Sequence, residues 1–334
     1  MNTTLEARLN GVDLFGESLR PTPRSVTAKR FGVPPFSVLN AREGDWQQRK
    51  QAWSSIGIQS ENGRAAEAFG DRSQRQNRRI LPGGGGPNSL YRSGTEKIVG
   101  DGQCQTSIFD PTLCELAYSW FCPPAGQVID PFAGGSVRGI VAACLGLRYW
   151  GCDLRGEQIA ANYSQGNSIC PAEVGTGALF WQEGDSMDMV PSALEADFVF
   201  SCPPYGDLER YSDDPRDLSA MEWHTFVAAY KRIILRSVER LKPNRFACFV
   251  VGDFRDPRGF YRDFVSETIR GFRDAGAELY NEAILVTSVG SASMRVARQF
   301  GAGRKLCKTH QNVLVFCKGD WRKAAQACAR INEP

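Results

Sequence analysis

The sequence predicts an α/β fold built around a doubly wound, mostly parallel sheet. Between residues 102 and 320, short apolar runs alternate with segments whose apolar residues recur at helical spacing. This alternation is typical of a parallel sheet with helices on both faces. Several runs end in an aspartate or a glycine, as strands do where they lead into loops at the carboxyl edge. A chain of 334 residues with 42% hydrophobic content can bury one large core, so we expect one main domain with an appendage.

The main domain is expected to contain seven strands. They are residues 127–130, 147–152, 178–182, 196–200, 246–251, 282–287 and 311–318. Helices are expected at residues 111–122, from 136, from 157, at 223–241 and at 260–275. The last two strands have only a long loop without a helix between them, so they should form an antiparallel pair at one edge of the sheet.

The ends of the chain differ from its middle. Residues 1–101 are expected to be an irregular basic extension with a glycine-rich linker, residues 102–320 the main domain, and residues 321–334 a tail. The first 100 residues contain 15 Lys/Arg and 9 Asp/Glu, whereas the remainder contains 25 and 28. A basic extension beside a mildly acidic domain suits a polyanionic partner. Within the extension, residues 45–53 are expected to form a short helix that docks through its two tryptophans.

The composition indicates neither a membrane protein nor a metalloprotein. No run approaches ~18 apolar residues and the N-terminus lacks the apolar core of a signal peptide, so we expect a cytoplasmic protein without a membrane partner. The eleven cysteines are all at least eight residues apart, and the chain has two histidines. Without a CxxC pair, we interpret the cysteines as reduced core residues and expect no metal. The oligomeric state does not follow from the sequence.

Three aspartates stand at the ends of the first three predicted strands. They are Asp130, Asp153 and Asp185, and in a parallel sheet they would share one rim. An adenosine needs such a rim, because one carboxylate accepts from the ribose hydroxyls, a second accepts from the exocyclic amine, and glycines let backbone amides approach. A dinucleotide site would explain the same acids, but Asp130–Ser136 is not GxGxxG and no second mononucleotide-binding half follows.

The fourth strand leads into the turn Cys202-Pro-Pro-Tyr205. Two prolines fix the backbone and remove amide donors, so the carbonyl groups of the turn can accept from a substrate amino group. The aromatic ring that follows can stack on a flat ligand. A base extruded from a nucleic acid helix is recognised by these means. Together, the acidic rim and the turn indicate an S-adenosylmethionine-dependent methyltransferase that acts on a nucleobase amino group.

These motifs resemble those of the DNA amino-methyltransferases, which modify adenine N6 or cytosine N4. The likeness covers about residues 104–318 and includes Ser107–Leu113, which looks like the family's methionine-side motif. It implies a Rossmann-like methyltransferase fold and a flipped base in DNA as substrate. It also implies S-adenosylmethionine as cofactor, with Asp130, Phe132, Ala133, Gly134, Gly135, Ser136, Asp153, Leu154, Asp185 and Ser186 as its binding residues. The catalytic turn would comprise Cys202, Pro203, Pro204 and Tyr205. The N-terminal third and the overall organisation of the chain resemble those of phage- or prophage-encoded members, which would act in the host cytoplasm.

Two features depart from the family pattern. Members normally have Asp, Asn or Ser before Pro-Pro, where this chain has Cys202, a weaker hydrogen-bond partner. A large C-terminal recognition domain is also not evident, since about sixteen residues follow Lys318. We therefore expect the N-terminal third and Thr287–Gln311, a segment with no acid, to recognise the substrate. Its expected DNA contacts are Arg295, Arg298, Arg304 and Lys305.

Three other functions stay open at this point. Cys202 could add covalently to a pyrimidine so that carbon 5 of cytosine is methylated, although the Pro-Cys order expected for that chemistry is reversed here. The same Pro-Pro-Tyr turn also serves RNA amino-methyltransferases. An inactive DNA-binding protein with this fold is the third alternative. Neither the target sequence, nor the choice between adenine and cytosine, nor the biological role follows from the residues.

Overall fold

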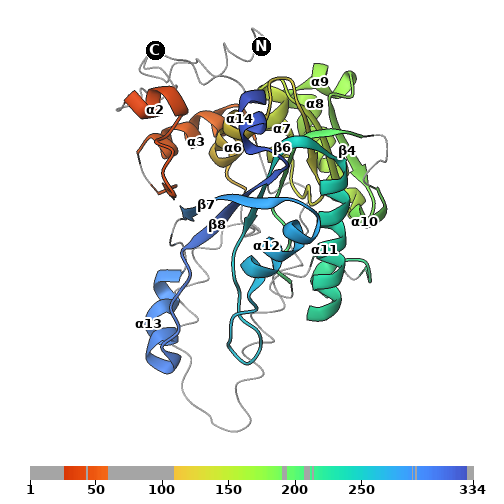
Figure 1. Ribbon diagram of the computed structural model, residues 1–334. Helices are drawn as coiled ribbons and strands as arrows, with labels where there is room; N and C mark the ends of the chain where they lie inside the picture. Colours follow the sequence, from red (N-terminus) through yellow and green to blue (C-terminus); the bar gives the residue numbers. More distant parts are fainter. Residues whose placement is uncertain are drawn as a thin grey trace.

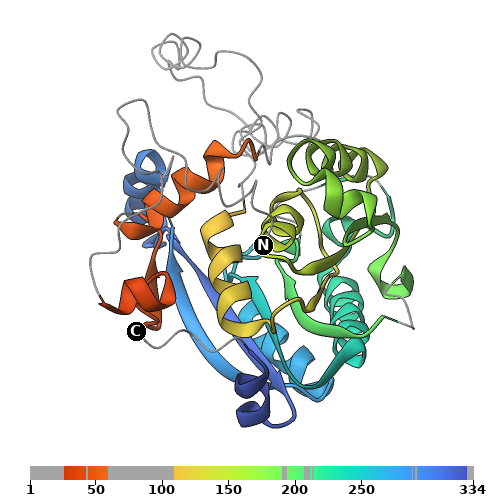
Figure 2. The same ribbon diagram turned by 90° about the horizontal axis from the view of Figure 1, so that it is seen from above.

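A computed structural model describes residues 26–42, 44–58, 109–189, 194–206, 211–212, 214–287, 289 and 292–328. An eight-stranded sheet runs through its middle and helices cover both faces (Figure 1, Figure 2). The strands are β1 (Val38–Asn40), β2 (Gln127–Asp130), β3 (Arg148–Asp153), β4 (Leu179–Glu183), β5 (Ala196–Ser201), β6 (Leu241–Val251), β7 (Glu278–Val286) and β8 (His310–Lys318). The helices are α2 (Val26–Phe31), α3 (Asp45–Ser55), α6 (Pro111–Phe121), α7 (Val137–Cys144), α8 (Gly156–Ile169), α9 (Pro171–Gly175), α10 (Ser186–Met189), η2 (Leu218–Ala220), α11 (Trp223–Arg240), α12 (Phe264–Asp274), α13 (Ala292–Gly303) and α14 (Trp321–Ala327).

The strand order is β1-β7-β8-β6-β5-β2-β3-β4. Neighbouring strands are parallel except at β8, which pairs antiparallel with both β6 and β7. The order reverses between β2 and β5, because β3 and β4 lie on one side of this point and the later strands on the other. Ligands of open α/β sheets bind at such a point, outside the carboxyl ends of the strands. The predicted doubly wound α/β fold is confirmed.

Two apolar cores lie on the two faces of the sheet. Val128, Phe198 and Phe200 belong to one core, whereas Ile129 and Val199, which alternate with them along β2 and β5, belong to the other. Both faces are covered, so the strands can be apolar at every position, and this is the pattern from which they were predicted. Helices α3, α6, α7 and α8 contribute to the first core, and α11 and α12 to the second.

The expected antiparallel pair of β7 and β8 is confirmed, but its expected place at the edge of the sheet was wrong. β8 lies between β6 and β7, and β7 is itself paired on its outer side. An eighth strand, β1, pairs in parallel with β7, with Val38–Asn40 opposite Ile284–Val286. A strand of three residues is too short to give a readable alternation of apolar and polar positions, so the sequence did not indicate it.

The N-terminal extension is also not irregular throughout. Helix α3 is the predicted docking helix, and its Trp46 and Trp53 are 2% and 3% exposed. Trp53 Nε1 donates to Glu115 Oε2 on α6 at 2.8 Å, and Arg49 forms an ion pair with the same carboxylate. This part of the extension is therefore built into the main body. The expected boundary at residue 101 and the glycine-rich linker lie outside the described residues.

Two further helices correct the prediction. Helix α13 occupies the segment between β7 and β8 that was expected to be a loop without a helix. Helix α14 lies in the expected tail, where Asp320 caps it by accepting from the Arg322 amide at 2.8 Å. Ala324 of α14 is fully buried in the first core, so this part of the chain packs on the domain.

The remaining expectations from composition can be compared with the described part of the chain. Its ten cysteines are free thiols, most of them buried, as predicted for small core residues. No helix in this part is long and apolar enough to cross a membrane. Among the same residues, no three His, Cys, Asp or Glu side chains gather as a metal site would require.

Candidate functional site

A cavity of about 320 Å³ lies at the carboxyl ends of β2, β3, β4 and β5. Eleven of the fourteen residues predicted for the cofactor and the catalytic turn line it: Phe132, Gly134, Gly135, Asp153, Leu154, Asp185, Ser186, Cys202, Pro203, Pro204 and Tyr205. Phe109, Asp110 and Leu113 of the expected methionine-side segment line it as well. Motifs that are far apart in the sequence therefore share one cavity.

The other three predicted residues are buried outside the lining of the cavity. Asp130 and Ala133 are fully buried and Ser136 is 2% exposed. The Ser136 hydroxyl donates to Gln165 Oε1 on α8 at 3.1 Å, so it joins two helices. These three residues support the loop after β2 without facing the cavity.

The Asp130 carboxylate is held by four donors of the protein itself. Its Oδ2 accepts from Arg138 Nε at 2.5 Å and from the Tyr149 hydroxyl at 2.7 Å. Its Oδ1 accepts from the Ser201 hydroxyl at 2.5 Å and from the Phe132 amide at 3.2 Å. A carboxylate has about four acceptor positions, so Asp130 has no capacity left for a ligand. Burial lowers the pKa of Arg138, but the adjacent Asp130 carboxylate more than reverses this effect and raises the pKa above its ordinary value.

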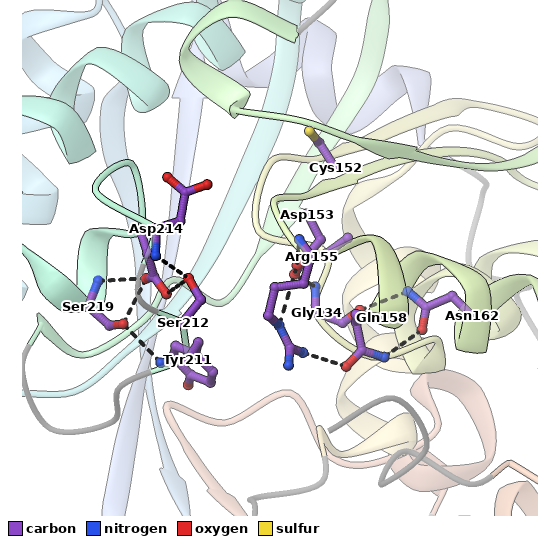
Figure 3. Close-up of polar contacts among 12 residues, drawn as sticks. Gly134, Cys152, Asp153, Arg155, Gln158, Asn162, Tyr211, Ser212, Asp214 and Ser219 are labelled. Atoms are coloured by element: carbon purple, nitrogen blue, oxygen red, sulfur yellow. Dashed lines mark hydrogen bonds and ion pairs between the residues drawn. The ribbon is translucent and has the colours of Figure 1, made fainter. Parts of the chain in front are cut away.

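Asp153 closes β3 and faces the cavity beside the loop after β2 (Figure 3). Its Oδ2 accepts from the Gly134 amide at 3.1 Å and its Oδ1 from the Arg155 amide at 2.9 Å. Gly134 has φ +48°, which favours glycine, and a Cβ there would meet only the Phe132 carbonyl oxygen, at 4.0 Å. Backbone rather than a side chain therefore faces the cavity at this position.

A chain of polar side chains fixes this loop from the α8 side (Figure 3). Arg155 Nη2 donates to Gln158 Oε1 at 2.8 Å, and Gln158 Nε2 donates to Asn162 Oδ1 at 3.0 Å. Asn162 Nδ2 then donates to the Gly134 carbonyl at 2.8 Å. Because the Gly134 amide is bound to Asp153 and the Gly134 carbonyl to Asn162, the backbone is held on both sides of this residue.

The pKa of Asp153 is raised above its ordinary value. Burial is the main cause, and the amides of Arg155 and Gly134 together with the Arg155 guanidinium only partly oppose it. The raised pKa means that the surrounding donors do not fully compensate the charged form. A ligand that donates hydrogen bonds to Asp153 would supply what is missing.

Asp185 and Ser186 continue the rim at the end of β4. Asp185 is 9% exposed and its Oδ1 accepts from the Met187 amide at 2.9 Å. The Ser186 hydroxyl donates to the Pro131 carbonyl at 2.5 Å, which connects the loop after β4 to the loop after β2. The three loops of the predicted adenosine rim are therefore cross-linked by hydrogen bonds.

The Cys202–Tyr205 turn follows β5 and carries a fixed aromatic ring. The Tyr205 hydroxyl accepts from Gln311 Nε2 at 2.7 Å. Its ring meets Phe254 and Phe264 edge-on, with centroids 6.4 and 6.2 Å apart. Burial raises the pKa of Tyr205 well above its ordinary value, and the neighbouring Cys202 adds to this, so the hydroxyl is uncharged at neutral pH.

Ser201 connects this turn to the loop after β2. It is fully buried directly before Cys202, and its hydroxyl donates to Asp130 and accepts from the Phe132 amide at 3.2 Å. One side chain thereby couples the positions of the two principal motifs. The sequence did not indicate this role, because a lone serine at the end of a strand carries no signal of its partners.

A second polar group, which includes Tyr211, Ser212, Asp214 and Ser219, lies opposite Asp153 (Figure 3). Asp217 of the same segment lines the cavity. Asp217, 6% exposed, accepts from the Ser219 amide at 2.8 Å, the Ser219 hydroxyl at 2.7 Å and the Ser212 hydroxyl at 2.8 Å. Arg216 lines the cavity beside it and pairs with Asp214 at 2.7 Å. No motif marked this segment in the sequence.

The N-terminal extension also lines the cavity. Ala41, Gln47 and Lys50 contribute to its lining. Lys50 Nζ lies 3.3 Å from Asp110 Oδ2, and Trp46 Nε1 donates to the same oxygen at 3.2 Å. The sequence predicted that α3 docks, but a docked helix gives no sign of which surface it covers.

The residues predicted to contact DNA lie around α13. Arg298, Arg304 and Lys305 are exposed, and the side chain of Arg295 lies outside the described part of the chain. Helix α13 projects beyond the end of the sheet (Figure 1). Thr287 and Gln311, at the two ends of this segment, both line the cavity. The basic segment therefore starts and ends at the cavity.

Comparisons with known proteins gave structural neighbours only. Neither models of protein families nor curated protein sequences match the chain. TrmN from Thermus thermophilus is 13% identical, with a TM-score of 0.41 over 63% of this chain and 49% of TrmN, so the chain spans about half of that protein. A candidate RNA methyltransferase from Pyrococcus horikoshii is 14% identical, with a TM-score of 0.42 over 75% of this chain and 98% of that one. A candidate DNA modification methylase from Thermus thermophilus is 18% identical, with a TM-score of 0.31 over 41% and 51%. These values are too low to assign a substrate, which must be inferred from the site itself.

Proposed function

We propose that the protein transfers a methyl group from S-adenosylmethionine to the exocyclic amino group of a flipped base in DNA, at cytosine N4 or adenine N6. The observation that supports this most is that the loops after β2, β3 and β4 line the same cavity as the Cys202–Tyr205 turn. The loops suit an adenosine and the turn suits a flat ring with an amino group. A methyl donor and its acceptor must meet at one point, and a shared cavity provides it.

The residues of the rim fit S-adenosylmethionine. Asp153 would accept from the ribose hydroxyls, because its raised pKa indicates an incompletely compensated carboxylate. The open space in front of Gly134 leaves room for a ligand against the backbone. Asp185 would accept from the adenine amine. When bound, this cofactor supplies a methyl group on a positively charged sulfonium.

The Cys202–Tyr205 turn would orient the acceptor base. The Tyr205 ring, held between Phe254 and Phe264 and by Gln311, would stack on the base without first having to be ordered. Carbonyl groups of the turn would accept from the amino group and keep its nitrogen lone pair available. In this scheme the protein supplies position and acceptors, and no side chain acts as a nucleophile.

One alternative is favoured by a specific observation. Cys202 lines the cavity. The second candidate function is therefore a covalent adduct between this cysteine and a pyrimidine, followed by methylation of carbon 5. The basic segment around α13 suits phosphate contact but contains no feature that selects DNA over RNA. The test must therefore distinguish the acceptor atom as well as the polymer.

The proposal is tested by transfer of a labelled methyl group from S-adenosylmethionine to duplex DNA, single-stranded DNA and RNA of matched sequence, followed by digestion and identification of the labelled nucleoside. We expect label in DNA, and none when Asp153→Ala replaces the parent protein. Asp188→Ala is the matched control, because the Asp188 side chain is 73% exposed and does not belong to the lining. Label in RNA alone would overturn the choice of DNA, and no label in any polymer would overturn the function.

A further inference from the structure

The segment between β6 and α12 forms a short hairpin at the end of β6 (Figure 1). Arg255 and Tyr261 form an antiparallel bridge. The Asp256 amide donates to the Phe260 carbonyl at 2.8 Å, and the Arg262 amide donates to the Phe254 carbonyl at 2.9 Å. Residues 254–262, called the 254–262 hairpin below, extend from the carboxyl edge of the sheet, where the cavity lies.

The tip of the hairpin is fixed although it is exposed. Asp256 Oδ1 accepts from the Phe260 amide at 2.9 Å, and Arg255 Nη1 donates to the Gly259 carbonyl at 2.9 Å. Gly259 has φ +95° and lies against the ammonium group of Lys305, from the segment after α13. The hairpin thus contacts the basic segment at Lys305, and these hydrogen bonds fix the backbone of its tip.

Two aromatic side chains of the hairpin face solvent. Phe260 is 67% exposed and Tyr261 is 49% exposed. A cation lies near each ring: the Arg255 guanidinium is 4.1 Å from the Tyr261 centroid, and the Arg258 guanidinium is 5.9 Å from the Phe260 centroid. Exposed rings interleaved with arginines are suited to unpaired bases, which stack on the rings while their phosphates meet the charges.

Neighbouring side chains lead from the hairpin to the cavity. The Lys308 ammonium lies 5.9 Å from the Tyr261 centroid. Lys308 Nζ and Tyr205 Cε1 both approach the point where a Cβ of Gly252 would stand, at 3.7 and 4.0 Å. Tyr205, Lys308 and Tyr261 therefore follow one another from the cavity to the hairpin, so a strand with one base in the cavity would continue over the hairpin.

We infer that the 254–262 hairpin is a stacking platform for unpaired bases adjacent to the base held in the cavity, with Phe260 and Tyr261 as the stacking residues. This rests on the proposed function, because a base in the cavity fixes where the strand runs. The shared chemistry is that of a single-stranded polynucleotide, whether DNA or RNA.

Direct binding tests the platform without any methyl transfer. Fluorescein-labelled single-stranded DNA and RNA 20-mers of the same sequence are titrated with the full chain, without cofactor, and followed by anisotropy over a range of salt concentrations. Stacking contributes about 1–3 kcal/mol per base, so Phe260→Ala/Tyr261→Ala, which removes two rings, should weaken binding by about 30-fold or more. Because no charge is removed, the slope of affinity against salt should not change.

Phe36→Ala is the matched control. Phe36 is 69% exposed, close to the value for Phe260, but it precedes β1 at the opposite, amino edge of the sheet. Its replacement should leave both affinities unchanged. A second variant, Phe260→Leu/Tyr261→Leu, keeps apolar bulk without an aromatic face and should bind as weakly as the double alanine variant.

Three results would overturn the platform: no binding by the parent protein, equal binding by the double alanine variant, or recovery by the double leucine variant, which would indicate a general apolar contact. An equal loss of affinity for DNA and RNA supports a platform that accepts either strand. A loss of affinity for one of them supports the platform and identifies the strand. Since the assay contains no cofactor, a failure of methyl transfer overturns the proposed function separately from these results.

Discussion

At the residue scale, Cys202 and Tyr205 distinguish the two candidate chemistries. In amino methylation the thiol forms no bond, so Cys202→Ser should keep substantial activity, since a hydroxyl is the better hydrogen-bond partner. Tyr205→Ala should lower kcat/KM by about 5- to 150-fold, because stacking contributes ~1–3 kcal/mol per base. Tyr205→Phe is the control that keeps the ring and removes the hydroxyl that accepts from Gln311.

A covalent mechanism at carbon 5 predicts the reverse ranking. Cys202→Ser would then abolish turnover, and the parent protein would become trapped on DNA that contains 5-fluorocytosine. Both results together would lead us to abandon amino methylation.

A second prediction at this scale concerns the charge of Asp153. Its raised pKa means that it takes up a proton at a higher pH than an exposed aspartate does. S-adenosylmethionine affinity should therefore fall as pH falls through this raised pKa, because a protonated carboxyl loses an acceptor that the ribose needs. Calorimetry should show that Asp153→Asn binds S-adenosylmethionine more weakly than the parent protein and with an affinity that does not change with pH. Asp188→Asn should have the affinity and the pH dependence of the parent protein.

The fold should tolerate this substitution. A carboxyl whose folded-state pKa is raised contributes stability below its unfolded pKa, and this contribution is lost as pH rises through the raised value. At neutral pH the ionised Asp153 is thus a cost that Asp153→Asn removes, which offsets the loss of one acceptor oxygen for the Gly134 and Arg155 amides. Unchanged affinity in a folded Asp153→Asn variant would refute the ribose role.

The sequence predicted which motif residues gather at the cavity but not what each one does there. Asp130 belongs to the most recognisable motif, yet its carboxylate accepts hydrogen bonds from Arg138, Tyr149 and Ser201 and is not available to a ligand. These partners come from other elements and follow no fixed spacing. For the same reason Gln311, which holds Tyr205, could not be found from the sequence.

At the element scale, the central strands and helix α13 differ in burial. The central strands were predictable because each is a continuous apolar run buried on both faces. Helix α13 was not expected, and its described side chains contribute to neither core, with Val296 and Phe300 39% and 41% exposed. A helix whose described apolar side chains face solvent is available to contact a partner.

The role predicted for α13 and the residue after it is phosphate contact. Arg298→Gln/Arg304→Gln should weaken DNA binding and reduce the slope of log affinity against log salt by about 1.4 to 1.8, which corresponds to two fewer phosphate contacts. Arg322→Gln/Lys323→Gln, on the exposed face of α14, is the matched control for the loss of two charges. An unchanged slope in the first variant would indicate that these arginines are only a solvated surface.

At the scale of the whole molecule, the described part of the N-terminal extension, residues 26–42 and 44–58, packs on the domain that holds the cavity. Trp53→Ala removes a buried indole and its bond to Glu115, and should lower the free energy of unfolding by about 3–5 kcal/mol. Chemical denaturation should show this in the main transition. Trp321→Ala, at 43% exposure, should have a smaller effect, and an unchanged main transition for Trp53→Ala would mean that the extension is separable.

We propose that a base held by the Cys202–Tyr205 turn is methylated on its exocyclic nitrogen. Nucleoside mass spectrometry of DNA from cells that express the protein tests it most directly. We predict N4-methylcytosine or N6-methyladenine in DNA from cells with the parent protein, and neither with Tyr205→Ala or Asp153→Asn at equal expression. 5-Methylcytosine instead, or new methylation confined to RNA, would contradict the account.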